Sequence, residues 1–287
     1  MRSRASYELR AGSNRILKTE NHPKRMSEIS RKLVIEEAGG KGEPLIFVHG
    51  LGGSSNTWYP QTQVLKRDLR LLCFDLAGSG RSPVTENISI ANHVDDLLGV
   101  IEYSGAKRVH LAGHSMGTIV CQHAAAKIPD RIASMVLVGA FPEPPEPARN
   151  ALRERAAKVR SDGMRAVAAT IAAAGTSADT KVNHPTAVAF ALESLMAQSA
   201  EGYARNCEAL AAAVAADLSA IQCPVLLLTG DEDRTAPVAV ARALASAMPA
   251  TELQILAGCG HWAPIERPKQ VNYAMSLFTA RNKKKTM

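Results

Sequence analysis

Short, mostly apolar runs alternate with amphipathic stretches along most of the chain. Such runs are typical of strands that are buried on both faces of a parallel sheet. They occupy residues 44–48, 69–75, 109–112, 132–138 and 225–229, and further strands are expected at 28–37 and 252–256. The stretches between them predict helices at 88–104, 118–126, 238–248 and 268–279. This rhythm predicts an α/β protein with a mostly parallel central sheet, right-handed crossovers and flanking helices.

The rhythm breaks after residue 141. Prolines cluster at 142–147, and the chain then predicts helices at 151–161, 164–174, 186–199 and 203–216, with no strand-like run among them. We therefore divide the chain into a basic tail (1–25), a first core part (26–141), a helical block (142–219), a second core part (220–280) and a second basic tail (281–287). The helical block is expected to close over a substrate as a cap, and a helical extension without that role is the alternative.

The sequence Gly113-His114-Ser115-Met116-Gly117 stands between an apolar strand-like run and a predicted helix. A G-x-S-x-G sequence at such a corner is typical of a nucleophile elbow, in which a strained turn holds the serine hydroxyl at the carboxyl end of the sheet. Side chains at either glycine would collide with the neighbouring strand and helix. The pattern predicts Ser115 as a nucleophile and the Met116 amide as an oxyanion donor. A glycine-rich turn without chemistry is the alternative for this motif alone.

A second glycine-rich loop follows the first buried strand. It reads His49-Gly50-Leu51-Gly52-Gly53, and its glycines would let the loop curl back toward the elbow. The amide of Leu51 is then expected to pair with that of Met116 as an oxyanion hole. We place His49 and Gly50 at the substrate site, with His49 more suited to bracing the backbone than to proton transfer. A phosphate-binding loop is disfavoured because no G-K-[ST] follows.

The remaining candidates for catalysis follow two later strands. Asp233 and His261 come after Ser115 in the order Ser…Asp…His, and each lies just past an apolar run. His261 would take the serine proton, and a carboxylate would orient its ring. Asp231 competes with Asp233 for the acid role, and the G-x-x-D-x-x-x-P spacing from 230 to 237 favours Asp233. No Cys/His cluster or H-E-x-x-H sequence predicts a metal site, and no cofactor is expected.

The net charge of +7 would suggest nucleic acid if it were spread over the chain. Instead, residues 1–25 hold seven basic and two acidic side chains and residues 281–287 hold four basic ones, so the part between has a slight acidic excess. We therefore expect no nucleic-acid partner. No apolar run is long enough to span a membrane. Five cysteines without a C-x-x-C predict reduced thiols and a cytoplasmic location, and no particular oligomeric state is predicted.

Residues 1–25 are expected to form a loose tail. A targeting peptide is a weaker reading, because Glu8 and Glu20 count against it. Translation that naturally begins at Met26 is a third.

Together, these motifs resemble the α/β-hydrolase superfamily, which inserts a helical cap after its sixth strand. More narrowly, the cap segments 155–163 and 201–210 are similar to those of 3-oxoadipate enol-lactonases and related carboxylesterases. This resemblance implies that Arg155 and Trp262 contact the substrate. Leu152 stands where that family has a tryptophan, so the core chemistry carries over better than the lactone substrate. A serine nucleophile also disfavours haloalkane dehalogenases and epoxide hydrolases.

The sequence therefore predicts a serine hydrolase that cleaves a small carboxylic ester or lactone through a covalent acyl-enzyme. Three other reactions on this fold stay open, namely carbon–carbon bond hydrolysis, thioester hydrolysis and a lyase-type step. A ligand receptor with slow or vestigial catalysis is the alternative from a different class of protein.

Overall fold

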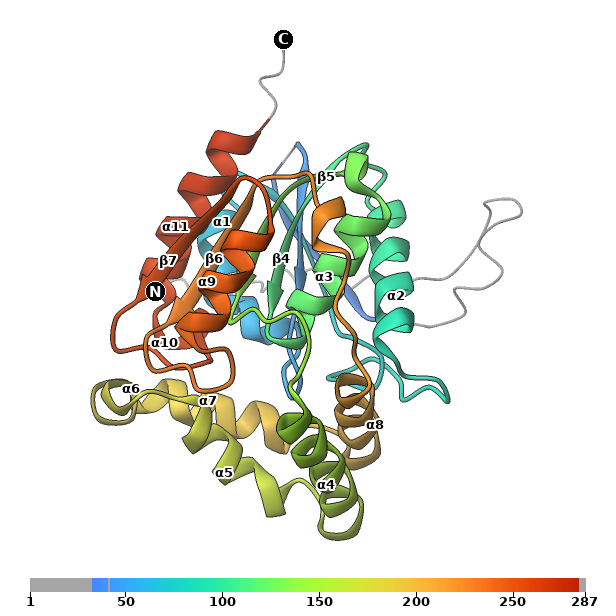
Figure 1. The fold of residues 1–287 in the computed structure, drawn as a ribbon, viewed down its shortest axis with the longest axis vertical. Coiled ribbons are helices and arrows are strands. Elements are labelled where there is room, and N and C mark those ends of the chain that lie inside the picture. The colour runs from blue at the N-terminus through green and yellow to red at the C-terminus, as the bar shows by residue number, and fades with distance from the viewer. Residues whose placement is uncertain (1–32, 41, 284–287) are drawn as a thin grey trace, which may run out of the picture.

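A computed structural model describes residues 33–40 and 42–283. A seven-stranded sheet lies at its centre, in the order β1-β3-β2-β4-β5-β6-β7 (Figure 1). β1 (Ile35–Gly39) pairs antiparallel with β3, and every other pairing is parallel. The parallel strands are β2 (Pro44–Val48), β3 (Arg70–Phe74), β4 (Val109–His114), β5 (Ile132–Val138), β6 (Val225–Gly230) and β7 (Thr251–Leu256). The predicted mostly parallel α/β fold is confirmed.

Helices cover both faces of the sheet, so β2, β4, β5 and β6 are buried at every position. β2 shows the two directions: Ile46 and Val48 join a core with α2 (Ile90–Tyr103) and α3 (Met116–Lys127), whereas Leu45 and Phe47 join a second core with α1 (Tyr59–Leu65) and α11 (Pro268–Asn282). α9 (Val238–Ala247) belongs to the first face through Leu244.

Five helices form the predicted block, which lies below the sheet in Figure 1. They are α4 (Glu146–Asp162), α5 (Arg165–Gly175), α6 (Ala178–Asn183), α7 (Pro185–Met196) and α8 (Ala200–Ala211). The block follows β5, which is the fifth strand among the described residues and not the sixth. The sequence pattern does not predict α6, because six residues are too few to show a helical period.

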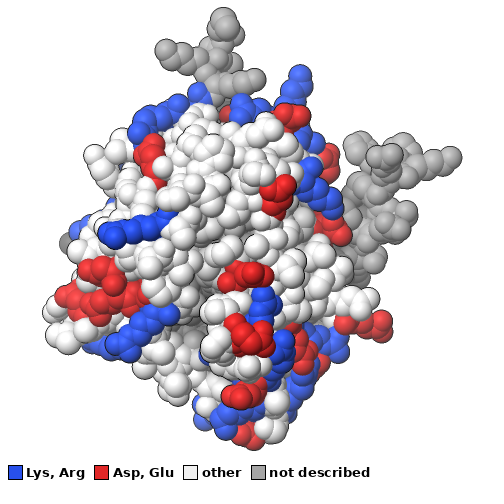
Figure 2. All heavy atoms as spheres, viewed as in Figure 1, with Lys and Arg blue, Asp and Glu red and all other residues white. Residues whose placement is uncertain are grey.

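Charged side chains of both signs mingle over the block on the face that Figure 2 shows. Arg160 of α4 pairs with Glu201 and Glu208 of α8, which ties these two helices together at the surface. Exposed pairs of this kind contribute little to stability, so this link between the helices is weak.

The chain termini differ in part from expectation. α11 continues through Asn282, so the predicted tail at 281–287 begins too early. The predicted tail at 1–25 lies outside the described residues. Within residues 33–40 and 42–283, no helix is both long and apolar enough to cross a membrane.

Candidate active site

Ser115 stands at the corner between β4 and α3, with backbone angles φ 52° and ψ −121°. A positive φ is uncommon for any residue with a Cβ and is often found where function requires strain. The neighbouring glycines leave no room for side chains. A Cβ at Gly117 would lie 2.3 Å from the carbonyl oxygen of Val48, and one at Gly113 would lie 2.6 Å from the carbonyl oxygen of Gly117. The turn therefore has the crowding that the sequence motif predicts.

The structure brings Ser115, His261 and Asp233 together in one chain of hydrogen bonds. The Ser115 hydroxyl donates to Nε2 of His261 over 2.8 Å, and Nδ1 of His261 donates to Oδ2 of Asp233 over 2.8 Å. Ser115 is only 7% exposed and His261 only 8%. The three side chains come from the ends of β4 and β6 and from the loop after β7, which meet at the carboxyl edge of the sheet.

The pKa values of Asp233 and His261 are shifted in opposite directions. Burial raises the pKa of Asp233, but His261 and the amides of Ala236 and Thr235 stabilise its carboxylate more strongly, so the pKa is lowered overall. Burial likewise opposes charge on His261, but the Asp233 carboxylate outweighs it, and the pKa of His261 is raised. The carboxylate also holds the His261 proton on Nδ1, which leaves Nε2 free to accept from Ser115.

Asp231 has a different partner. Its Oδ1 accepts the backbone N–H of Cys259 over 3.0 Å, two residues before His261. It therefore braces the loop that carries the histidine, whereas Asp233 bonds the ring itself. This geometry favours Asp233 over Asp231 as the orienting carboxylate.

The loop of residues 49–53 lies directly against the elbow. A Cβ at Gly50 would lie 2.8 Å from the Cβ of Ser115, so only glycine fits there. Among residues 33–40 and 42–283, the amide N–H groups of Leu51 and Met116 have no hydrogen-bond acceptor. An unpaired amide next to a serine hydroxyl can stabilise an oxyanion.

His49 supports this loop and does not line the site. Its Nε2 accepts the N–H of Leu76 over 2.9 Å and its Nδ1 donates to the carbonyl oxygen of Gly50 over 2.8 Å. The ring is fully buried, and burial lowers its pKa. Both nitrogens are occupied, so the substrate-contacting role predicted for His49 does not fit, and its bracing role does.

The other two predicted contact residues are Trp262 and Arg155. Trp262 is buried beside His114, with ring centroids 5.7 Å apart, and its indole faces Gly175. Arg155, on α4, is half-buried next to Tyr203. Tyr203 in turn packs against Gly52 of the glycine-rich loop. Arg155 thus lies in the helical block, one side chain removed from the loop beside Ser115.

The helical block bonds to both loops that surround Ser115. The His261 amide donates to the carbonyl oxygen of Gly175 at the end of α5, over 2.7 Å. Ser194 of α7 and Gln198, just after that helix, donate to the carbonyl oxygen of Gly52 over 2.9 and 3.4 Å. The sequence pattern does not predict these contacts, since an isolated polar residue carries no local signal of its partner.

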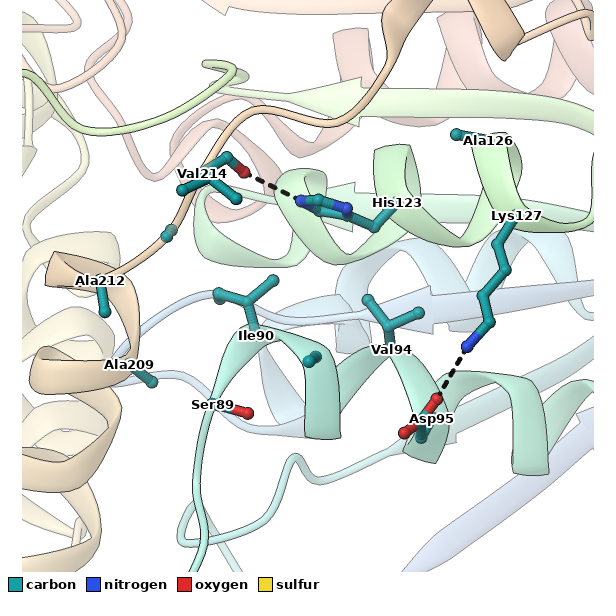
Figure 3. A pocket seen from close by; sticks show the side chains of 12 residues that line it. Ser89, Ile90, Val94, Asp95, His123, Ala126, Lys127, Ala209, Ala212 and Val214 are labelled. Atoms are coloured by element: carbon teal, nitrogen blue, oxygen red, sulfur yellow. Dashed lines mark hydrogen bonds and ion pairs between the residues drawn. The ribbon is translucent and has the colours of Figure 1, made fainter.

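A separate pocket of about 570 Å³ lies between α2, α3 and the end of α8 (Figure 3). Mostly apolar side chains line it, with Ser89 and His123 among them, and the ion pair of Lys127 with Asp95 lies at one side. None of the residues around the Ser115 hydroxyl lines it, so this pocket is distinct from the candidate active site. In the described part of the chain, no three His, Cys, Asp or Glu side chains are grouped so that they could hold a metal ion. All five cysteines are free thiols and buried.

Comparison with known proteins identifies the class. A family model for the alpha/beta hydrolase fold matches residues 43–268, and the chain therefore belongs to the α/β-hydrolase family and is a hydrolase. An (E)-2-((N-methylformamido)methylene)succinate hydrolase of Acinetobacter baylyi is 27% identical over 83% of this chain and 91% of its own length.

Two solved structures are similar in both fold and sequence. An esterase from Thermogutta terrifontis superposes with a TM-score of 0.84 and 28% identity, over 88% of this chain and 94% of its own. The enol-lactonase of Burkholderia xenovorans LB400 has a TM-score of 0.83 and 27% identity, over 88% of this chain and 98% of its own. The resemblance to enol-lactonases and esterases is thereby confirmed.

Proposed function

We propose that this hydrolase cleaves small carboxylic esters or lactones with Ser115 as nucleophile, His261 as general base and acid, and Asp233 as the carboxylate that orients the ring. The observation that carries the proposal is the continuous hydrogen-bonded path from the Ser115 hydroxyl through His261 to Asp233, at 2.8 Å for each step. It begins at the strained corner of Ser115, which the unpaired amide of Met116 follows directly and against which the loop with the unpaired amide of Leu51 packs.

The reaction follows from this geometry in two halves. Nε2 of His261 takes the Ser115 proton as Oγ attacks the acyl carbon, and the amides of Leu51 and Met116 stabilise the oxyanion. The tetrahedral intermediate collapses, the bond to the alkoxy oxygen breaks, and His261 gives its proton to that leaving group. Water then attacks the acyl-enzyme while His261 takes its proton, which releases the acid and restores Ser115. In a lactone, the acid and the alcohol are the two ends of one product.

The five-helix block would act as a cap in this scheme. It bonds the loops on both sides of Ser115 and leaves Ser115 and His261 almost buried, which favours a site with little bulk water. Arg155 and Trp262 are proposed to contribute to the substrate site. Similarity to the esterase and the enol-lactonase supports the ester and lactone class.

The direct test is mass spectrometry after treatment with a fluorophosphonate, with Ser115→Ala alongside. A single adduct on Ser115, absent from the variant, is expected, because only an activated serine reacts readily with this reagent. A panel of esters, lactones, thioesters, dienoic ketones and N-acyl compounds would then rank the substrate classes. A well-folded protein without an adduct would refute the proposed mechanism and favour a ligand receptor.

A further inference from the structure

One buried carboxylate near the site takes no part in the mechanism above. Glu266, at the end of α10 (Ala263–Glu266), is only 2% exposed. Its Oε2 accepts the amides of Gly260 and Ser177 over 3.0 and 2.9 Å, and its Oε1 accepts the amide of Trp262 over 2.9 Å. A carboxylate is the side-chain group that can accept three N–H donors at once and donate none.

These donors flank the candidate base. Gly260 and Trp262 are the residues immediately before and after His261, whose own amide is bound by the carbonyl oxygen of Gly175. Three successive amides of the loop are therefore fixed, two by Glu266 and one by the helical block. Gly260 has no space to move toward the block, since a Cβ there would lie 2.6 Å from the Gly175 carbonyl oxygen.

The third donor, Ser177, belongs to the helical block. It lies just before α6, and its hydroxyl donates to the carbonyl oxygen of Gly258 over 2.5 Å. Beside it, Arg267 bonds Thr180 over 3.2 Å and pairs with Asp179. Segment 175–180 is thus joined to the loop after β7 by side chains from both partners, with Glu266 at the centre.

We propose that Glu266 is a positioning residue that sets His261 against Ser115 by holding the loop of residues 258–262 to segment 175–180 of the helical block. This role rests on the proposed function. It makes the helical block part of the support for the base, so that the alignment of His261 depends on a contact between segments 89 residues apart. Buried groups that hold a reacting side chain in place matter because small displacements in the reacting geometry slow catalysis strongly.

Charge gives the role a measurable signature. The groups that face His261 are Asp233, Glu266 and His114. Burial lowers the pKa of His114 to about 3, so its ring is neutral, whereas both carboxylates raise the pKa of His261 against the opposing effect of burial. Replacing Glu266 by a neutral residue should therefore favour neutral His261 and move its titration to lower pH.

The test measures the rate at which a fluorophosphonate labels Ser115, as a function of pH, in the wild type, Glu266→Gln and Glu266→Asp. The glutamine offers a single acceptor oxygen, so at least one amide loses its partner. We expect labelling to slow by about 10-fold to 100-fold and its acid midpoint to fall. The aspartate keeps the charge on a shorter side chain, so its midpoint should stay near that of the wild type while its rate lies between the other two.

Glu232→Gln is the matched control. Its Oε2 accepts the amide of Ala178 over 2.8 Å, so it also bonds segment 175–180, but it is exposed and bonds none of the amides around His261. This variant should label at the wild-type rate with the wild-type midpoint.

Each outcome has a distinct meaning. A wild type that does not label refutes the proposed function and the positioning role with it. A wild type that labels, with Glu266→Gln equal to it in rate and midpoint, refutes only the positioning role, as does an equal loss in Glu232→Gln. If thermal melting shows that Glu266→Gln does not fold, Glu266→Asp decides, and a wild-type rate in that variant overturns the proposal.

Discussion

Replacing each of the two competing aspartates by asparagine tests the assignment of the acid most sharply. In Asp233→Asn, the remaining carbonyl oxygen would keep the amides of Thr235 and Ala236, which Oδ1 now accepts over 2.8 Å each. The new amide group would then face Nδ1 of His261, where Oδ2 accepts a proton at present.

The expected loss of kcat in Asp233→Asn depends on which ring nitrogen of His261 carries the proton. An amide N–H donating to Nδ1 forces the His261 proton onto Nε2, and Nε2 can then no longer accept from Ser115. Stabilisation of the imidazolium is lost as well. We expect kcat to fall about 10⁴-fold, as this substitution does in a serine protease, which corresponds to about 5 kcal/mol in the activation barrier.

Asp231→Asn provides the control. Its carbonyl oxygen can still accept the amide of Cys259, which is the only hydrogen bond that the carboxylate makes within the described residues. We expect kcat to change by about 2-fold or less. A substitution that preserves the contacts of the original side chain usually changes the free energy of the folded protein by roughly 0.5 kcal/mol or less.

Hydrolysis of p-nitrophenyl acetate measures kcat for the wild type and both variants under one condition. The wild-type kcat is calculated per fluorophosphonate-reactive site. Far-UV circular dichroism and thermal melting establish that each variant is folded. An Asp231→Asn variant as impaired as Asp233→Asn would show that the acid is misassigned, and full activity in Asp233→Asn would refute the reasoning from the tautomer.

Three further results are expected. Ser115→Ala should lower kcat by roughly 10³-fold or more in the same assay, and near-normal turnover would refute the assignment of Ser115 as the nucleophile. kcat/KM should rise with pH through a midpoint above 6.5, the ordinary pKa of histidine, because only neutral His261 accepts the proton and its pKa is raised; a midpoint below 6.5 would contradict this. Gly202→Ala should lower the free energy of unfolding in urea by about 1–3 kcal/mol, although alanine favours helices, because its Cβ would lie 2.1 Å from the Gly78 carbonyl oxygen. Ala169→Gly, at an exposed position in α5, measures the difference in unfolding free energy between alanine and glycine in a helix without a packing change. A Gly202→Ala variant more stable than the wild type would contradict the packing argument.

Local pattern was sufficient for much of the fold. The mostly apolar run at 132–138 coincides with β5, and the apolar run at 44–48 coincides with β2, because a strand buried on both faces is apolar at most of its positions. The elbow around Ser115 was equally visible, since its glycines are required by crowding within a few residues of the chain.

The sequence by itself therefore determined the six parallel strands, the long helices and the order of Ser115, Asp233 and His261, because each of these depends on burial or on spacing along one segment. The strand expected at 28–37 differs from β1 at Ile35–Gly39 and extends outside the described residues. Only the tertiary structure decided what the neighbouring polar groups do. It placed the Cys259 amide against the Asp231 carboxylate, gave both ring nitrogens of His49 a hydrogen-bond partner, and placed the Ser177 amide against the Glu266 carboxylate. The physical reason is that a hydrogen bond is satisfied by whichever donor folding brings within about 3 Å, and in these loops the donor comes from a different part of the chain.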